Sequence, residues 1–185
     1  DVTVNSVNDA PIINDGNATL ALSATEDTTA SFSLTSLTAT DVDTALSGLT
    51  WSIDTNASPG VASISGSGAS PSTFSFVPDG NFTGSDSFVV EVSDGALSDL
   101  ITIDVTVNSV NDAPIINDGN ATLALSATED TPTSFTLTSL TAIDVDTVSG
   151  LLAWSVDTNA SHGVATVSGS GASPVTFSYL PDANF

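Results

Sequence analysis

The chain contains no Lys and no Arg among its 185 residues, although it has 22 Asp and Glu residues and a formal net charge of −22. Such a surface cannot replace the counterions of nucleic acids or of anionic lipids, which excludes both as partners. Clustered carboxylates have no Lys or Arg to pair with. They must stay apart, take up protons or bind a cation from outside the chain.

Cysteine and methionine are also absent, and there is a single histidine, His162. The absence of Cys excludes a disulfide framework and thiolate metal sites. The chain has no Cys or Lys to act as a nucleophile, and its single His, which could activate a hydroxyl, has no counterpart in the other copy. Paired carboxylates hydrolyse glycosides only when one acid is held protonated in a cleft, whereas the acids here recur in loops. We therefore predict that the chain is not an enzyme.

Long hydrophobic runs and abundant aromatics are missing as well. No stretch approaches the length of about 20 apolar residues that crosses a membrane as a helix, so we predict no membrane insertion. There are only two Trp residues and one Tyr, few for a sugar-stacking surface. Yet 40% of the residues are hydrophobic and only 12% are charged, so the chain can form a core, unlike a disordered acidic segment.

The chain repeats itself. Residues 1–82 align without a gap with residues 104–185, an offset of 103, and differ at 17 of the 82 positions. Apolar sites stay apolar, as where Ile53 becomes Val156 and Ile64 becomes Val167. His162 replaces Pro59 of the first copy, so it is expected to be a loop residue rather than a ligand. Two copies this similar indicate tandem duplication.

Alternation of period two predicts strands throughout. Phe88, Val90 and Val92 fall on one face of their strand, and Trp51 alternates in phase with Leu49 and Ile53, so both Trp51 and its counterpart Trp154 are predicted core residues. A second apolar stripe follows at Ile101, Ile103, Val105 and Val107. Turn signals at Asp15-Gly16, Pro59-Gly60, Asp79-Gly80 and Asp94-Gly95 separate the runs.

About seven strands in about 103 residues predict an all-β fold of tandem Greek-key β-sandwiches of the immunoglobulin or cadherin type. Residues 1–8 are interpreted as the last strand of a preceding repeat, 9–111 as a complete repeat and 112–185 as a second repeat that stops before its last two strands. We expect those strands to follow in a longer polypeptide. The alternative is that a neighbouring chain supplies them by β-augmentation.

Three acidic signatures recur in both copies: Glu26 in "ATEDT", Asp41-x-Asp43 in "TATDVDT" and Asn8-Asp9 in "VNDAP". Asp94 in "VSDG" of the first copy is added to them. Each motif alone also suits a turn that an Asp side chain caps. Carboxylate and amide oxygens are, however, the ligands that Ca²⁺ takes, six to eight at a time. Together the motifs favour a Ca²⁺ site.

In their order, these motifs resemble the cadherin-like or immunoglobulin-like tandem repeats of giant bacterial surface adhesins of the RTX and Bap types. The resemblance covers essentially the whole chain and implies Ca²⁺ at the junctions between repeats. Compared with animal cadherins, Ser109 replaces the first Asp of the linker, and "NFTGSD" stands where an acidic motif would be, so fewer ions per junction are expected. Asp86 at the end of that stretch is an additional, weaker ligand candidate.

The resemblance assigns two sets of metal ligands. The second set, at one junction, would comprise Glu26, Asn111, Asp112, Asp144 and Asp146. The first set, at the preceding junction, would comprise Asn8, Asp9, Asp41, Asp43 and Asp94.

The sequence therefore predicts an extracellular, cell-surface stalk repeat of a large secreted adhesin, which Ca²⁺ rigidifies and which supports cell adhesion or biofilm formation. Its expected partners are neighbouring repeats of the same polypeptide or the next subunit, with a glycan or surface ligand bound elsewhere in the protein. Two alternatives stay open: a self-assembling extracellular filament completed by donor strands, and a cadherin-like carbohydrate-binding module.

Overall fold

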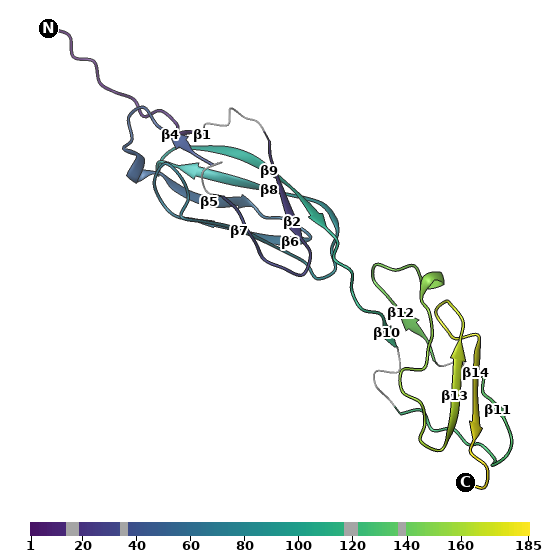
Figure 1. Ribbon diagram of the computed structural model, residues 1–185. Helices are drawn as coiled ribbons and strands as arrows, with labels where there is room; N and C mark the ends of the chain where they lie inside the picture. The colour runs from purple at the N-terminus through teal and green to yellow at the C-terminus, as the bar shows by residue number, and fades with distance from the viewer. Residues whose placement is uncertain (14–18, 34–36, 117–121, 137–139) are drawn as a thin grey trace. The chain divides into compact units, whose positions relative to one another are not determined.

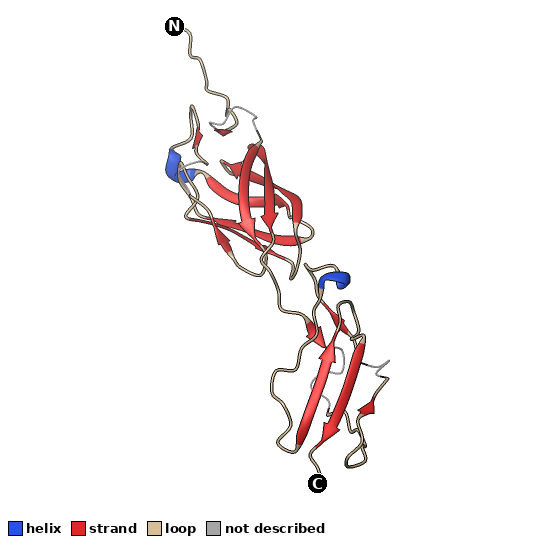
Figure 2. Ribbon diagram, turned by 45° about the vertical axis from the view of Figure 1, so that its right-hand side comes forward, coloured by secondary structure: helices blue, strands red, loops and turns tan. Residues whose placement is uncertain are grey.

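A computed structural model of the chain describes residues 1–13, 19–33, 37–116, 122–136 and 140–185 (Figure 1). The chain divides into two compact units, Asp1–Val110 and Asn111–Phe185. Among the described residues, helical structure is limited to the short 3-10 turns η2 (Leu46–Gly48) and η3 (Ser149–Leu151), and strands make up the rest of the regular structure (Figure 2). The prediction of an all-β fold is therefore confirmed. The predicted turn at Asp15-Gly16 lies outside the described residues.

The described residues of the first unit form two larger sheets, one of four strands and one of three. The four-stranded sheet has the order β2-β9-β8-β5, and the three-stranded sheet has the order β3-β7-β6. The bounds are β2 (Leu20–Thr25), β3 (Ala30–Ser31), β5 (Thr50–Thr55), β6 (Gly60–Ser65), β7 (Thr73–Pro78), β8 (Gly84–Ser93) and β9 (Ser98–Asn108). A short ladder also joins β1 (Ile12–Ile13) to β4 (Ala39–Thr40).

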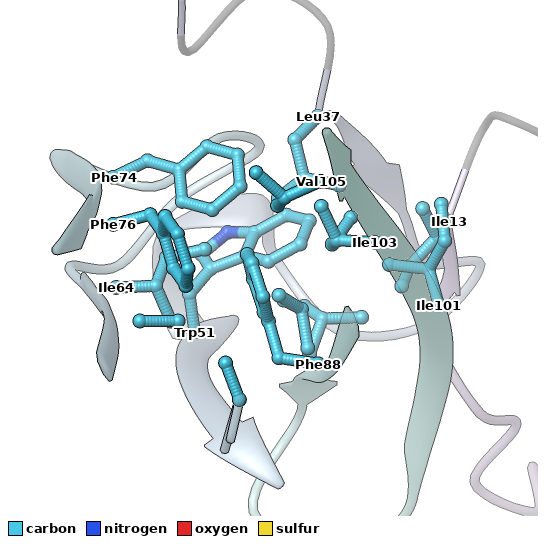
Figure 3. Packing of buried hydrophobic residues seen from close by; sticks show 14 of the residues in the cluster. Ile13, Leu37, Trp51, Ile64, Phe74, Phe76, Phe88, Ile101, Ile103 and Val105 are labelled. Carbon is cyan, nitrogen blue, oxygen red and sulfur yellow. The ribbon is translucent and has the colours of Figure 1, made fainter. Parts of the chain in front are cut away.

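The core of the first unit lies between the two sheets (Figure 3). Phe88, Val90 and Val92 of β8 are buried, as are the four alternating apolar residues of β9, so the predicted inward faces are confirmed. From the opposite sheet, Phe74 and Phe76 meet Phe88 with ring centroids 5.9 and 6.1 Å apart. The period-two pattern therefore buries the stripes that it predicts.

Trp51 anchors this core and is only 4% exposed. Its indole Nε1 donates a hydrogen bond of 3.0 Å to the carbonyl of Gly68, which satisfies the polar atom of the ring. Gly60 at the start of β6 allows a further close approach, because a Cβ there would lie 2.6 Å from the Phe76 ring. Its φ of 143° also favours glycine.

β2 is an edge strand that runs parallel to the end of β9. The pairing extends from Leu20 opposite Ile103 to Thr25 opposite Asn108. The Asn108 side chain reinforces it, because Nδ2 donates to Ser23 Oγ at 2.8 Å and to the Ala24 carbonyl at 3.0 Å. The last residues of β9 therefore hold β2 in the sheet.

The second unit repeats only part of this arrangement. It has a three-stranded sheet in the order β11-β14-β13 and a two-stranded ladder of β10 and β12. The bounds are β10 (Ile115–Ile116), β11 (Thr133–Ser134), β12 (Ala142–Ile143), β13 (Gly163–Ser168) and β14 (Thr176–Pro181). Counterparts of β8 and β9 are not among the 185 residues, because Phe185 corresponds to Phe82.

The prediction that Trp154 is a core residue needs correction, because this side chain is half-buried rather than buried. Its Nε1 still donates to the Gly171 carbonyl at 2.9 Å, as in the first copy. The residues that follow it form no strand, whereas in the first unit β5 is paired with β8. Trp154 therefore keeps its local contact and lacks the sheet that covers Trp51. His162 lies in a turn, as predicted.

Candidate metal centre

The first set of predicted ligands gathers at one end of the first unit. Asp41 and Asp43 follow β4, Asp94 lies in the turn between β8 and β9, and Asn8 and Asp9 precede β1. Asn8 Nδ2 donates to Asp94 Oδ2 at 2.7 Å, and the Asp9 amide donates to Asp43 Oδ2 at 3.1 Å. Segments distant in sequence therefore bring all five predicted residues into one hydrogen-bonded group.

One carboxylate oxygen of Asp41 is hydrogen-bonded within the loop that Asp41 begins. Asp41 Oδ1 accepts hydrogen bonds from the amides of Asp43 at 3.0 Å and Thr44 at 2.7 Å. The other oxygen, Oδ2, is buried and has no hydrogen-bond partner. The turn-capping role is therefore real for Oδ1, but it leaves Oδ2 unused, and a buried unpaired carboxylate oxygen is costly.

Asp94 uses both of its oxygens. Its Oδ1 accepts from the amides of Ala96 and Leu97, each at 2.7 Å, and its Oδ2 accepts from Asn8. The Leu97 amide, then the Asn8 side chain and the Ala96 amide, hold the pKa of Asp94 below its usual value. Asp94 therefore favours its charged form.

The pKa of Asp41 is also lowered, chiefly by the hydrogen bond from the Thr44 amide and also by Asp43. Partial burial and the negative charge of Asp94 act in the opposite direction. The hydrogen bonds outweigh these opposing effects. The neighbouring carboxylates of Asp41 and Asp94 therefore both stay ionised, in a chain without Lys or Arg. A cation from solution would relieve their repulsion.

The second unit builds the same loop with the same contacts. Asp144 Oδ1 accepts from the amides of Asp146 at 3.0 Å and Thr147 at 2.6 Å, and Asp146 Oδ2 accepts from the Asp112 amide at 2.6 Å. Asn111 Nδ2 donates to the Asp112 carbonyl at 2.8 Å. Four of the five residues assigned to the second set therefore lie together within this unit.

The fifth residue, Glu26, follows β2 at the opposite end of the first unit from Asp94, because the two lie at opposite ends of the β8–β9 hairpin. It is fully buried. Its amide donates to the Asn108 carbonyl at 3.1 Å, and its Oε1 accepts from the Val110 amide at 2.8 Å. Its Oε2 is buried without a hydrogen-bond partner.

These residues fit a hard cation. They offer carboxylate and amide oxygens, and two of the buried oxygens, Asp41 Oδ2 and Glu26 Oε2, lack a hydrogen-bond partner. Calcium binds six to eight such oxygens, with water and backbone carbonyls completing the shell. Asp86, the weaker candidate, also has a buried Oδ2 without a partner, while its Oδ1 accepts from the amides of Ser58 and Ser87.

Sequence reasoning missed two acids that have structural roles. Asp99 Oδ2 accepts from the Ile13 amide at 2.9 Å and so ties β1 to β9. Asp27 Oδ1 accepts from the Asn81 amide at 3.1 Å. Asp27 and Asn81 both have a φ of 58°, and Asn and Asp are enriched in that conformation. The only signal in the sequence was Asp and Asn beside expected turns.

The fold and the acidic loops define a class, that of tandem β-sandwich proteins with carboxylates gathered at the ends of the sandwich. The family model for the bacterial Ig domain matches residues 8–107 and 111–185, so the chain belongs to the bacterial immunoglobulin-like domain family. Domains of this family are typically not catalytic and usually lie outside the cell or on its surface. No curated protein matches the chain.

Several solved structures resemble the chain at low identity. An endo-fucoidan hydrolase of glycoside hydrolase family 107 is 19% identical with a TM-score of 0.46, and the match covers 94% of this chain and 24% of that one. Cadherin domains 1–5 of protocadherin gamma B2 are 16% identical with a TM-score of 0.46, over 95% and 32% of the two chains. Titin domains Z1Z2 in complex with telethonin are 12% identical with a TM-score of 0.40, over 97% and 85%.

The chain thus spans about a quarter of the length of the first of these structures. Within the described residues, no helix has the length and apolar character needed to cross a membrane.

Proposed function

We propose that the chain is a structural extension repeat of a larger bacterial surface adhesin, and that Ca²⁺ bound by its acidic loops stiffens the connection between consecutive repeats. Such a repeat would act outside the cell and would support cell adhesion or biofilm formation by holding a binding domain away from the surface. Its role would be mechanical rather than catalytic.

The observation that carries this proposal is the pair of buried carboxylate oxygens without hydrogen-bond partners, Asp41 Oδ2 and Glu26 Oε2. The chain has no Lys or Arg that could neutralise them. Removing a charged oxygen from water without a hydrogen-bond partner is unfavourable, and a divalent cation would offset that cost. The resident cation would be Ca²⁺, because each set offers several carboxylate and amide oxygens, whereas Mg²⁺ usually binds one or two carboxylates and keeps several waters.

In this function the hydrogen bonds of the loops orient the ligands. The amides that bind Asp41 Oδ1 and Asp144 Oδ1 fix each loop and leave the second carboxylate oxygen for the ion. Asn8 and Asn111 sit in "VNDAP", where Pro restricts the residue before it to extended conformations and so stiffens the connecting segment.

The test is a titration with CaCl₂, with NaCl at equal ionic strength as the reference. We expect Ca²⁺ to raise the melting temperature and lower the translational diffusion coefficient, because a stiffened connection lengthens the molecule on average. Calcium at about ten times its Kd should add about 1.4 kcal/mol to the free energy of unfolding. Weak extracellular sites have Kd values of about 0.1–1 mM.

The matched variants replace carboxylates by amides, which keep the turn-capping oxygen. Asp144→Asn with Asp146→Asn should remove the Ca²⁺ response of the second set. Asp54→Asn with Asp157→Asn removes the same charge from exposed residues that each accept a hydrogen bond from the neighbouring Thr, and should leave the response intact. Equal responses of both double variants would contradict the proposal.

A further inference from the structure

One edge of β6 in the first unit has no neighbouring strand among the described residues. β7 pairs with the other edge of β6 over all six residues, without a bulge. β5 bonds to the chain beyond the end of β6, where the Trp51 amide donates to the Gly66 carbonyl at 3.0 Å. A sheet edge presents backbone N–H and C=O groups that can bind another strand, so natural proteins protect such edges.

The side chain of Asn56 occupies this edge. Its Oδ1 accepts from the Ala62 amide at 2.7 Å, and its Nδ2 donates to the Ala62 carbonyl at 3.2 Å. These two bonds to one residue reproduce the pair that a residue of a neighbouring antiparallel strand would make. Because the backbone groups of Ala62 point away from β7, alternation places those of Gly60 and Ile64 on the same edge.

The second unit has the same contact on β13. Asn159 Oδ1 accepts from the Ala165 amide at 2.7 Å, and its Nδ2 donates to the Ala165 carbonyl at 3.3 Å. The contact forms there although the connecting segment differs, with His162 in place of Pro59. It is therefore a feature of this strand edge rather than of one loop sequence.

Other common forms of edge protection are missing from β6. Its sequence, GVASIS, contains no charged residue and no proline. In a chain with 22 carboxylates, the 24 residues of 55–78 contain no Asp or Glu, and neither do the 24 residues of 158–181. The charge repulsion that keeps two copies of the chain apart is therefore weakest at this edge.

We propose that the Asn56 side chain acts as a strand mimic that closes a self-association surface. Without it, the β6 edge of one copy of the chain pairs antiparallel with the β6 edge of a second copy. The occupant is a second copy because a two-fold axis makes this uncharged edge its own complement. Ala62 would lie opposite Ala62 and Gly60 opposite Ile64, so that every outward backbone group is paired.

The chemistry of the side chain suits this role. An amide supplies an acceptor oxygen and a donor nitrogen, which match the N–H and C=O of Ala62. Ala62 is only 3% exposed, and buried backbone groups that lose their partners are costly. A strand from a second copy would restore both bonds. The contact would be far smaller than the roughly 1,200 Å² of a stable interface, so the association should be weak and reversible.

The first test compares the unchanged chain with Asn56→Ala by sedimentation velocity over a wide range of concentration, at about 0.15 M salt. A chelator is present, because the edge is separate from the acidic loops and the outcome is independent of Ca²⁺. We expect Asn56→Ala to strengthen dimerisation at least about tenfold. Thr55→Ala removes a neighbouring side chain that bonds to Asp54 instead, and should stay monomeric.

A second variant keeps the test valid if the alanine chain does not fold. Asn56→Ser keeps a short acceptor for the turn but no longer reaches both backbone groups of Ala62, so it should also dimerise. Native Trp51 fluorescence shows that the first unit is folded in each variant. Amide hydrogen exchange of Ala62 should be faster than in the unchanged chain at low concentration, and should slow again as the variant associates.

The third measurement separates this role from a merely structural one. Ser63 is exposed on β6 and would lie close to the two-fold axis, opposite Val61 of the second copy. Adding Ser63→Glu to Asn56→Ala places like charges near each other across the pair. We expect it to restore the monomer without restoring the melting temperature that Asn56→Ala loses. A loss of loop structure alone would give no association for Ser63→Glu to reverse.

The register can be fixed by cross-linking, because the chain has no Cys of its own. In the Asn56→Ala background, a Val61→Cys chain is mixed with a Ser63→Cys chain under oxidising conditions. The proposed register brings these two Cα atoms to about 4.5 Å, within the range of a disulfide. Two Val61→Cys chains would be about 8 Å apart, beyond that range. We expect the mixed disulfide to be at least tenfold more abundant than either symmetric one.

An Asn56→Ala chain that is folded and stays monomeric at every concentration would overturn the proposal, and so would an unchanged chain that associates equally well. Association that Ser63→Glu leaves unaltered would place the contact elsewhere than β6. Unfolding of both Asn56→Ala and Asn56→Ser would also overturn it, because Asn56 would then be needed for the fold rather than for closing the edge.

Discussion

The two copies contain the same six residues, LALSAT, in two different states. In the first copy they are β2, paired with β9, and in the second copy Leu123–Thr128 forms no strand. Trp51 is buried and Trp154 is half-buried, although each indole donates to the carbonyl of the equivalent glycine, Gly68 or Gly171. The comparison teaches that local sequence gives these segments the capacity to form a strand, and that a partner strand decides whether they do.

The hairpin and the acidic loop that both copies form support the same conclusion. β13 and β14 pair with each other as β6 and β7 do, because both strands of that hairpin are present. The acidic loop at Asp144 also keeps the hydrogen bonds of its counterpart at Asp41. Structure built from nearby residues is formed in both units, whereas structure that pairs with β8 and β9 is formed only in the first.

The largest effect should come from completing the second copy. Adding the sequence of Thr83–Val110 after Phe185 supplies both strands that the first copy has. We expect Leu123–Thr128 to become a strand and Trp154 to become buried, which brings this copy towards the roughly 5–15 kcal/mol of an ordinary domain. Amide hydrogen exchange of Leu123–Thr128, together with a blue shift of Trp154 fluorescence in a Trp51→Phe background, measures the change. Unchanged exchange would contradict the role assigned to the partner strands.

The next effect concerns the core that only the first copy has. Phe88→Ala removes a buried ring that contacts Phe74 and Phe76, and should lower the free energy of unfolding of the first unit by about 3–5 kcal/mol. Denaturant unfolding followed by Trp51 fluorescence in a Trp154→Phe background reports it. The matched control is Val61→Ala on β6, an exposed apolar residue, which should change stability by less than about 0.5 kcal/mol.

A smaller effect on stability should distinguish Glu26 from its counterpart in the second copy, Glu129. Glu26 is fully buried with an unpartnered Oε2, and Glu129 is exposed. With a chelator present, Glu26→Gln should stabilise the first unit by about 1 kcal/mol, because it removes a buried unpaired charge and keeps an oxygen for the Val110 amide. Glu129→Gln should change stability by less than about 0.5 kcal/mol. Thermal unfolding of both variants measures the difference, and a loss of stability in Glu26→Gln would refute the argument.

The smallest effect is on the pH dependence of the first unit. The folded protein lowers the pKa of Asp41 and of Asp94, so the unfolded chain takes up protons first as the pH falls. Their contribution to stability is therefore fully present above the ordinary Asp pKa of about 3.9, and it is lost as the pH falls through the lower folded values. Asp94→Asn should flatten the acid limb of a plot of melting temperature against pH. An acid limb as steep as that of the unchanged chain would show that Asp94 does not contribute.

Much of the fold could be predicted from local pattern. The alternation of Phe88, Val90 and Val92 identified their buried face, because side chains of a strand alternate by geometry. The 103-residue offset identified two repeats. The parallel pairing of β2 with β9 could not be predicted, because the pattern gives the inward face of a strand but not its neighbour.

The candidate site was predicted as a set of residues rather than as a geometry. The motifs named Asn8, Asp43 and Asp94, but only the folded chain shows Asn8 bonded to Asp94, 86 residues away. It also distinguishes Asp41, whose Oδ2 lacks a partner, from Asp94, both of whose oxygens are used. Hydrogen bonding of individual oxygens depends on loop conformation, which composition and spacing do not encode.

The sequence by itself determined the one-signed charge, the tandem duplication, the capacity of each segment to form a strand and the acidic motifs, because each is written in the order of neighbouring residues. The tertiary structure decided which strands pair, which Trp is buried and which carboxylate oxygens are left without a hydrogen bond. The physical reason is that pairing and burial need partners that are distant in the chain, so identical stretches take different states where those partners differ.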